Sequence, residues 1–519
     1  MASPSERNPD PHRPRVMGLE TEYGILLAGG GPLTELQERL DELHPMHLSN
    51  AVVRAYGQLV AQRPTGWDYE TESPLADQRG FELARSDALA EQLTDVESGL
   101  ANLVLTNGAR LYVDHAHPEY ATPEVTTARD AVLWDRAGDQ AMVLASRAAS
   151  EVLGREIRLY RNNTDGKGAS YGSHENYLLH RSTPFSRVVV QFTPFLVSRS
   201  VVVGAGRVGI GQSSELAGFQ LSQRADFFET EVGLETTVNR PIINTRDEPH
   251  ADARTSRRLH VITGDASSSE YAGWLKVGTA ALVLALVEAG TWPDPPRLLD
   301  PVRAMHEISH DPTLRATVEL DDGRRLSGLD LQQLVLDAVR THLARAEEDP
   351  GAEAAELLTG WQQVLDDLRT DPARCADRLD WVAKQHLLER YRERDGLAWD
   401  APKLALVDLQ YADIDPRRSL HAALVARGRM RRLVGEAEVE HARTSPPTDT
   451  RAWFRGQCMR RFADQVVAAS WDSVIFQLDR ERSWIRLPMP DPLRGTRAHV
   501  GELFDRAADA GELLALLGS

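Results

Sequence analysis

The sequence contains very little lysine and very little cysteine. All but four of its 59 basic residues are arginine, the exceptions being Lys167, Lys276, Lys384 and Lys403. We attribute this bias mainly to GC-rich codon usage, to which the bidentate grip of arginine on phosphate and carboxylate groups can add. The two cysteines, Cys375 and Cys458, fit no zinc-site or disulfide spacing. A reducing compartment is therefore expected.

Long apolar runs and a secretory leader pattern are also missing. The first 15 residues are polar and rich in proline, without the apolar segment of a signal peptide. The longest mostly apolar run, residues 277–287, is about 11 residues long and predicts a buried helix rather than a membrane span of about 20 residues. We therefore expect a cytoplasmic protein without a membrane partner. A formal charge of -18 excludes a protein whose whole surface binds nucleic acid.

Hydrophobic patterning divides the chain into parts. Residues 127–153 predict a long amphipathic helix, and strand-like segments follow between residues 157 and 263, two of them at 188–192 and 201–203. Helical patterns return after residue 296. This order predicts an α+β fold around a mostly antiparallel sheet rather than a doubly wound parallel sheet.

We expect four regions along the chain. They are a disordered tail at 1–14, a large domain at 15–404, an insertion within it at 26–66, and a small C-terminal domain at 405–519. The glycine-rich entry and exit of the insertion favour a mobile loop, although a plain helical hairpin fits it about as well.

Common phosphate and zinc motifs are absent. The segment Gly204–Gly209 fits GxGxxG by count, but it lies in a strand-rich stretch where no helix clearly begins, so we interpret it as a glycine-rich turn. The sequence has no GxxxxGK[ST] and no HExxH motif. A bound nucleotide would have to be held by side chains and metal.

Carboxylates recur at strand spacing. Glu20 and Glu22 are two positions apart and share one face of a predicted strand, where a divalent metal is a good candidate to compensate their repulsion. In a strand over 109–114, alternation places Arg110, Tyr112 and Asp114 on one face. With Glu119 after the turn, this group suits metal and anion binding with acid, base or nucleophilic chemistry. An exposed edge strand would have a similar pattern.

Histidine and arginine residues form further candidates. His174 and Asn176 follow a glycine-rich turn and share a strand face, which suits a metal or phosphate ligand. The arginines gather downstream together with His260, at Arg199, Arg224, Arg246, Arg257 and Arg258. Structural pairing with nearby aspartates explains any single arginine, but the cluster favours recognition of phosphate or carboxylate.

Several long motifs together resemble one family. They are GLETEYG (18–24), NGARLYVDHAHPEYATPE (107–124), NNTDGKGASYGSHENY (162–177), LSQRAD (221–226), RPIINTRDEPHAD (240–252), RRLHVITGD (257–265) and LKVGTAALVLALVEAG (275–290). This set resembles the Pup ligase and Pup deamidase/depupylase family, glutamine-synthetase-like enzymes that act on the small prokaryotic ubiquitin-like protein Pup. The segment WDYETESPLADQRGF at 67–81 is similar to that of the deamidase/depupylase branch.

The resemblance implies a glutamine-synthetase-like domain whose curved sheet cradles ATP and Mg²⁺. It implies Asp114 as the catalytic residue, acting as nucleophile or as the base that activates water. By motif position, the metal residues would be Glu20, Glu22, Tyr112, Glu119 and His174. The residues that contact ATP would be Arg110, Thr122 and Trp471. The side chains that face phosphate or the scissile amide would be Arg224, Arg246 and His260.

The implied activity is hydrolysis within the proteasome pathway. The enzyme would deamidate the C-terminal Gln of Pup and cleave the isopeptide bond between Pup and substrate lysines, requiring ATP without spending it at each turnover. Its partners would be Pup and pupylated proteins, and we expect a monomer. An ATP-consuming Pup–protein ligase is the alternative, and a catalytically silent Pup-binding protein is a third.

Overall fold

The computed structural model describes residues 14–28, 44–86, 88, 100–346, 351–478 and 484–518. The predicted tail, except for residue 14, and residues 29–43 of the predicted insertion lie outside the described residues.

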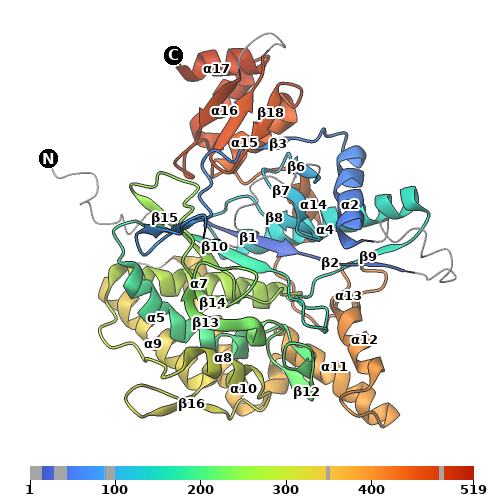
Figure 1. Cartoon of the computed structure of the whole chain (residues 1–519), viewed down its shortest axis with the longest axis vertical. Helices are drawn as coiled ribbons and strands as arrows, with labels where there is room; N and C mark the ends of the chain where they lie inside the picture. The colour runs from blue at the N-terminus through green and yellow to red at the C-terminus, as the bar shows by residue number, and fades with distance from the viewer. Residues whose placement is uncertain are drawn as a thin grey trace.

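A six-stranded antiparallel sheet lies at the centre of the molecule (Figure 1). Its strand order is β15-β10-β1-β8-β7-β6, with bounds Ser256–Val261, Ser173–His180, Met17–Glu22, His117–Ala121, Arg110–Asp114 and Asn102–Val104. Every neighbouring pair is antiparallel. The predicted α+β class with a mostly antiparallel sheet is therefore confirmed.

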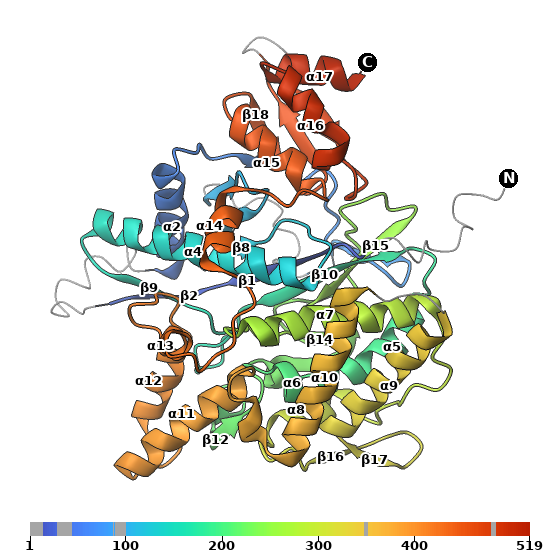
Figure 2. The same cartoon turned by 180° about the vertical axis from the view of Figure 1, so that it is seen from behind.

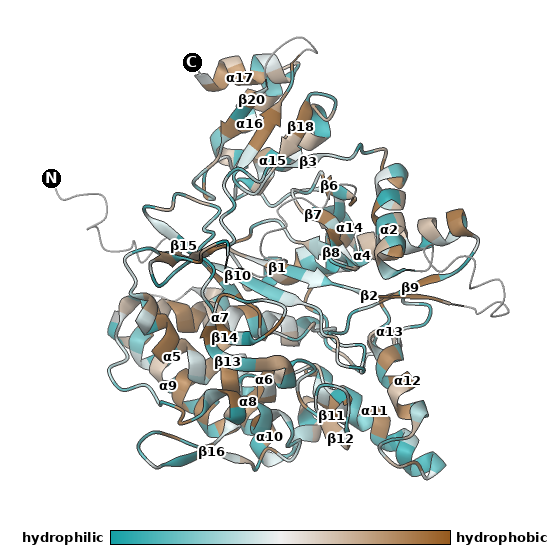
Figure 3. Ribbon diagram, viewed as in Figure 1, coloured by the Kyte–Doolittle hydropathy of each residue, from teal (hydrophilic) through white to brown (hydrophobic). Residues whose placement is uncertain are grey.

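The largest hydrophobic core lies between this sheet and a layer of helices. Strands β1, β10 and β15 contribute one face to it, through Met17, Leu19, Tyr177, Leu179, Leu259 and Val261. The helices are α5 (Phe185–Ser198), α7 (Glu270–Ala289), α8 (Pro301–Ser309), α9 (Gly328–Ala346), α10 (Ala352–Thr370) and α11 (Asp380–Asp395). Figure 3 shows brown, apolar stretches along the helices of this layer.

Two predicted strands in this region are helices instead. Residues 188–192 belong to α5, and residues 201–203 belong to α6 (Ser200–Val203). Their valine-rich sequences have a high β-propensity, but most of their side chains are buried in the large core, and burial overrides local preference. An apolar run that is buried on several sides also lacks the alternation of apolar and polar residues that distinguishes a helix from a strand.

Helix α7 accounts for the longest apolar run. By length and composition it could cross a membrane, with a mean hydropathy of 1.5, but 67% of that window is buried inside the protein. Its side chains pack in the large core, as the sequence predicted for residues 277–287.

A second core lies behind the other half of the sheet, where α2 (Pro45–Leu59) and α4 (Ala128–Leu153) pack together (Figure 2). Helix α4 is the predicted long amphipathic helix. It begins after Thr127, whose side chain accepts a hydrogen bond from the Asp130 amide, and ends at Gly154 in the left-handed conformation. Leu111 and Val113 of β7 point into this core, so the alternating residues of β7 face the opposite side.

A third, smaller core builds the C-terminal part, at the top of Figure 1. It joins α15 (Ala452–Arg461), β18 (Val466–Ala469), β19 (Ser473–Phe476), β20 (Ile485–Pro488), α16 (Arg497–Arg506) and α17 (Ala510–Gly518). Strand β3 (Gly66–Trp67) adds to its sheet in parallel with β18. Helices α12 (Pro402–Tyr411) and α14 (Glu436–Thr444) contribute to the large core instead. The predicted domain boundary at residue 405 stays a prediction. The buried residues of the third core are Trp67, Val104 and residues from Trp453 onward.

The remaining elements are short. They are β2 (Gly24–Leu27) with β9 (Ile157–Tyr160), β4 (Ala76–Asp77) with β5 (Phe81–Glu82), β11 (Arg207–Ile210) with β12 (Leu216–Gln220), β13 (Phe228–Gly233) with β14 (Arg240–Asn244), β16 (Thr317–Glu319) with β17 (Arg325–Ser327), and α13 (Leu420–Ala426). The glycine segment 204–209 follows helix α6 and leads into strand β11. This is the reverse of the strand, turn and helix of a dinucleotide fingerprint, as predicted.

Candidate active site

The register of the central sheet aligns polar side chains on its open face. Glu119 of β8 lies opposite both Glu22 of β1 and Tyr112 of β7. Glu20 lies opposite His174. Directly opposed residues in an antiparallel pair have Cβ atoms about 5 Å apart, so the register alone brings side chains from distant sequence segments together.

These side chains line a cavity of about 340 Å³. Nine of the twelve predicted site residues line it: Glu20, Arg110, Tyr112, Asp114, Glu119, His174, Arg246, His260 and Trp471. A second cavity of about 70 Å³ adjoins it and shares Glu20 and Trp471. Thr122 lines this smaller cavity, and its hydroxyl accepts a hydrogen bond from the Leu19 amide at 2.9 Å.

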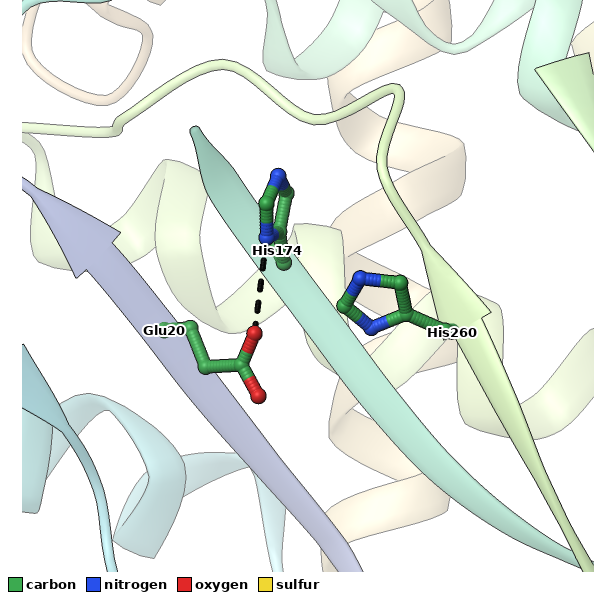
Figure 4. Close-up of side chains that lie close together, drawn as sticks. All are labelled: Glu20, His174 and His260. Atoms are coloured by element: carbon green, nitrogen blue, oxygen red, sulfur yellow. Dashed lines mark ion pairs between the residues drawn. The ribbon is translucent and has the colours of Figure 1, made fainter. Parts of the chain in front are cut away.

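Glu20, His174 and His260 form the first cluster, drawn in Figure 4. One ligand atom from each lies within 4.8 Å of the others, and Glu20 Oε2 is 3.4 Å from His174 Nδ1. Asn176 Nδ2 donates to Glu20 Oε1 at 2.9 Å, while its Oδ1 lies 3.0 Å from His260 Nδ1. The amide of Asn176 thus fixes Glu20 and His260 relative to each other.

The charges in this cluster follow from its surroundings. Burial alone would raise the pKa of Glu20, but the hydrogen bond with His174 and the Coulombic attraction of the neighbouring basic side chains, Arg258 among them, outweigh it and hold this pKa well below its usual value. Burial, and then Arg258, lowers the pKa of His260 well below 6.5. Near neutral pH the cluster therefore presents an ionised carboxylate and a neutral imidazole, both of which can bind a cation.

Glu22, Asp114 and Glu119 form the second cluster, again with ligand atoms within 4.8 Å of one another. Burial alone would raise the pKa of Glu22, but hydrogen bonding from His117 and from the Gly172 amide lowers it to about 2. Burial, and then the charges of Asp114 and Glu22, raises the pKa of Glu119 well above 4.5. Such a set of hard oxygen donors fits Mg²⁺, whose charge would remove the repulsion.

Asp114 is the accessible member of this cluster. It is the last residue of β7, and its side chain is 40% exposed, whereas Glu22 and Glu119 are buried. His115 Nδ1 lies 2.9 Å from its carboxylate. A carboxylate at the cavity surface can reach a substrate carbonyl or a water molecule.

Arg110 lies between two aromatic rings. Its guanidinium carbon is 3.8 Å from the ring centroid of Trp67 on one side and 3.8 Å from that of Tyr112 on the other. Its Nε donates to Asn102 Oδ1 at 2.7 Å. These contacts fix the cation on the cavity wall.

Residues 67–81, the segment that the sequence associates with the deamidase/depupylase branch, form one wall of the cavity. Tyr69, Glu72 and Pro74 line it directly. The Gln78 side chain donates to the Arg246 carbonyl at 3.0 Å and to the Arg258 carbonyl at 2.7 Å. The segment is therefore hydrogen bonded to the backbone of two arginines that line the cavity.

The structure does not bring Arg224 to either cavity. Its side chain is buried, donates to the Ile262 carbonyl and to Ser170 Oγ, and packs on the ring of Phe228. Its predicted contact with phosphate or the scissile amide stays a prediction, as do the chemical roles of the other site residues.

Sequence reasoning did not single out several cavity residues, among them Glu72, Glu248 and His250. All three belong to quoted motifs, so the available signal was the motif itself rather than any spacing within it. The contact between Ser73 N and Glu248 Oε1 at 3.1 Å joins two of these motifs in space.

Comparisons with known proteins identify the family of the chain. Residues 15–475 match the family described as Pup-ligase protein. The chain belongs to this family.

Relatives with two kinds of name are similar to the chain. A depupylase of Acidothermus cellulolyticus is 55% identical over 97% of this chain and 99% of its own length. A Pup deamidase/depupylase of Mycolicibacterium smegmatis is 53% identical over 96% and 99%. A Pup–protein ligase of Micrococcus luteus is 44% identical over 79% and 90%.

The fold is that of a solved Pup ligase. The ligase PafA in complex with Pup superposes with a TM-score of 0.77 and 31% identity, covering 95% of this chain and 92% of that one. PafA in complex with ADP gives a TM-score of 0.71 and 33% identity, covering 82% and 94%. The predicted glutamine-synthetase-like fold is confirmed.

Proposed function

We propose that the protein is a hydrolase that deamidates the C-terminal Gln of Pup to Glu and cleaves the isopeptide bond between Pup and substrate lysines. The observation that carries this proposal is the similarity over almost the whole chain to proteins named depupylase or Pup deamidase/depupylase. The ligase relative is less similar and matches a smaller share of the chain. The cavity wall built by residues 67–81 supports the same choice.

The nucleotide is proposed to bind where the two cavities meet. The neighbour solved with ADP supports a nucleotide site on this fold. In this chain Trp471 borders both cavities, Thr122 lines the smaller one and Arg110 the larger one. An arginine held between two rings gives a fixed positive charge for a phosphate group.

Mg²⁺ would be held by the two carboxylate clusters. Glu20, Glu22 and Glu119 supply oxygen atoms, and His174 and Tyr112 adjoin them in the same cavity or cluster. When bound, the ion would neutralise the crowded carboxylates and the nucleotide phosphates.

Asp114 would attack the amide carbon of Pup or take a proton from the water molecule that does so. Both routes place negative charge on the amide oxygen, and Arg246 lines the same cavity and can stabilise that charge. The buried carboxylates beside Asp114 would direct the amide to this one exposed oxygen donor.

Mass spectrometry tests the activity directly. Pup ending in Gln, incubated with the protein, ATP and Mg²⁺, should gain about 1 Da, and a Pup–substrate conjugate should release free Pup. Asp114→Asn should abolish both reactions, while Asp505→Asn on the exposed surface should not. An inactive wild-type protein, or equal activity of Asp114→Asn, would contradict the proposal, and one ADP formed for each Pup conjugated would establish the ligase instead.

We also propose that the protein acts as a monomer in the cytoplasm. Analytical ultracentrifugation of the full chain, with and without Pup, tests the first part. Fractionation of source cells tests the second.

A further inference from the structure

We infer that Trp67 is a positioning residue that aligns Arg110 and Trp471 for nucleotide binding. The indole belongs to the C-terminal core and contacts Arg110 of strand β7, and it begins the segment 67–81. This inference rests on the proposed function, because it assumes that the nucleotide binds beside these two side chains.

The first contact of Trp67 is with Arg110. The guanidinium lies 3.8 Å from the indole centroid, and Tyr112 holds its other side at the same distance. Tryptophan gives the strongest cation–π attraction of the three aromatic side chains, and the attraction grows when the pair is shielded from water. With Asn102 holding Nε, the indole and the phenol determine the plane of the guanidinium.

The second contact is with Trp471. The two rings meet edge to face, with centroids 5.4 Å apart and an angle of 74°. This is a favoured geometry for an aromatic pair. Arg455 lies 5.0 Å from the Trp471 ring, which therefore has a cation and a second indole as neighbours. Because Trp471 borders both cavities, its tilt changes the shape of each.

Trp67 is itself held in place at two points. Its Nε1–H donates to Glu72 Oε1 at 2.6 Å. Its backbone pairs with Ala469 of β18, and the next amide, of Asp68, donates to the Ala469 carbonyl at 3.0 Å. Because both the indole N–H and the backbone of Trp67 are fixed, a shift of Arg110 or of Trp471 against the indole affects the other side chain.

The plain alternative is that Trp67 only fills the small core, in which it is buried. Loss of packing would then lower the midpoint of unfolding and leave the ATP affinity of folded protein unchanged. A positioning role changes ATP affinity itself, and the effect depends on Trp471.

The experiment is calorimetric titration of the full-length protein with ATP and Mg²⁺. We expect Trp67→Leu to weaken ATP binding about tenfold, the size of a shielded cation–π contact. The double variant with Trp471→Leu should bind ATP more tightly than the product of the two single effects predicts, because the two changes disrupt one arrangement. Trp484→Leu is the control, since this tryptophan is 65% exposed in the same C-terminal part.

Glu72 supplies a second, milder pair of variants in case Trp67→Leu does not fold. Glu72→Gln keeps an acceptor for the indole N–H, and Glu72→Leu does not, while both remove the same charge. We expect Glu72→Leu to bind ATP about threefold more weakly than Glu72→Gln, as loss of one hydrogen bond predicts. Equal affinity in this pair would overturn the inference.

Two further outcomes separate the inference from the proposed function. Folded Trp67→Leu that binds ATP as the wild type does, or single effects that multiply, would overturn the inference alone. A wild-type protein that binds no ATP would overturn it together with the nucleotide part of the proposed function.

Discussion

Glu22 and Glu119 lie directly opposite each other on strands β1 and β8, and both are buried. Burial would raise the pKa of both, but His117 and the Gly172 amide stabilise ionised Glu22 and lower its pKa, while burial and the neighbouring carboxylates raise the pKa of Glu119. The pair is therefore arranged to hold one proton or one cation between them.

This arrangement predicts a pH-dependent effect of Glu119→Gln. Without metal, the raised pKa of Glu119 means that the folded state keeps a proton that the unfolded state loses above pH 4.5. Wild-type stability should therefore fall relative to Glu119→Gln as pH rises from 5 to 7, by about 1.4 kcal/mol per pH unit below the folded pKa. Urea unfolding in EDTA measures this difference, and a constant difference across these pH values would contradict it.

Mg²⁺ should stabilise the wild type more than it stabilises Glu119→Gln. At 100 times its Kd the ion should stabilise the wild type by about 2.7 kcal/mol. Glu119→Gln loses a charged ligand and should gain much less. The check is thermal unfolding of both proteins across an Mg²⁺ titration, and equal stabilisation of both would show that Glu119 is not a ligand.

Gly172→Ala should disturb the site more than the fold. A Cβ at this position would lie 2.5 Å from both Glu22 Oε1 and His174 Nε2, two side-chain ends that can move. We expect the free energy of unfolding to change by about 1 kcal/mol. Activity on Pup should fall about tenfold or more, because Glu22 and His174, one from each carboxylate cluster, are displaced.

Gly273→Ala is the matched control for Gly172→Ala. The nearest atom to a Cβ there is 3.5 Å away, an ordinary contact, and the position lies inside helix α7. Activity assays and urea unfolding of both variants should separate the two effects. A loss of activity in Gly172→Ala no larger than that in Gly273→Ala would contradict the prediction.

Arg455→Ala should destabilise the contact between the C-terminal core and the central six-stranded sheet. Arg455 is buried and binds Glu124, the Gly108 carbonyl at 2.9 Å and the Trp471 carbonyl at 2.8 Å. Its removal leaves the Glu124 carboxylate, whose side chain is only 13% exposed, and two carbonyls short of donors, which should cost about 3 kcal/mol. Arg460→Ala, an exposed arginine on the same helix, should change the free energy of unfolding by less than about 1 kcal/mol. Chemical denaturation compares the two, and similar costs would count against this role.

Lys276 predicts a stability change at alkaline pH. Its ammonium is buried and donates to the Asp265 carbonyl at 2.9 Å, and burial lowers its pKa to about 8. Because the unfolded lysine binds a proton more tightly, stability should rise with pH above 8. Relative to Lys276→Met, the wild type should gain about 2 kcal/mol between pH 7 and pH 9.5. A gap that stays the same at both pH values would disprove this account.

Local pattern was sufficient where one strand face is apolar and the other polar. The alternation in β7 predicted which side chains face the cavity, since Leu111 and Val113 can only be buried on the other face. Helix α4 was predictable for the same reason, because its cap and its period are both local.

The sequence could not predict the register of the strands or how deeply each side chain is buried. The pairing of Glu20 with His174 joins residues 154 positions apart, and nothing local specifies it. Arg224 and Arg246 have similar motif contexts, yet one is buried against a carbonyl and the other lines the cavity. The two valine-rich helices show the same limit, because burial on several sides removes the period.

The parallel pairing of Gly66 with Ala468 also has a consequence for synthesis. The ribosome synthesises β3 some 400 residues before β18, the strand with which β3 pairs. During most of translation Trp67 therefore has no pairing partner. Contacts of such long sequence separation form late in folding. A chain that stops short of β18 lacks Trp471 as well, so incomplete products of translation carry the carboxylate clusters without the complete wall of the two cavities.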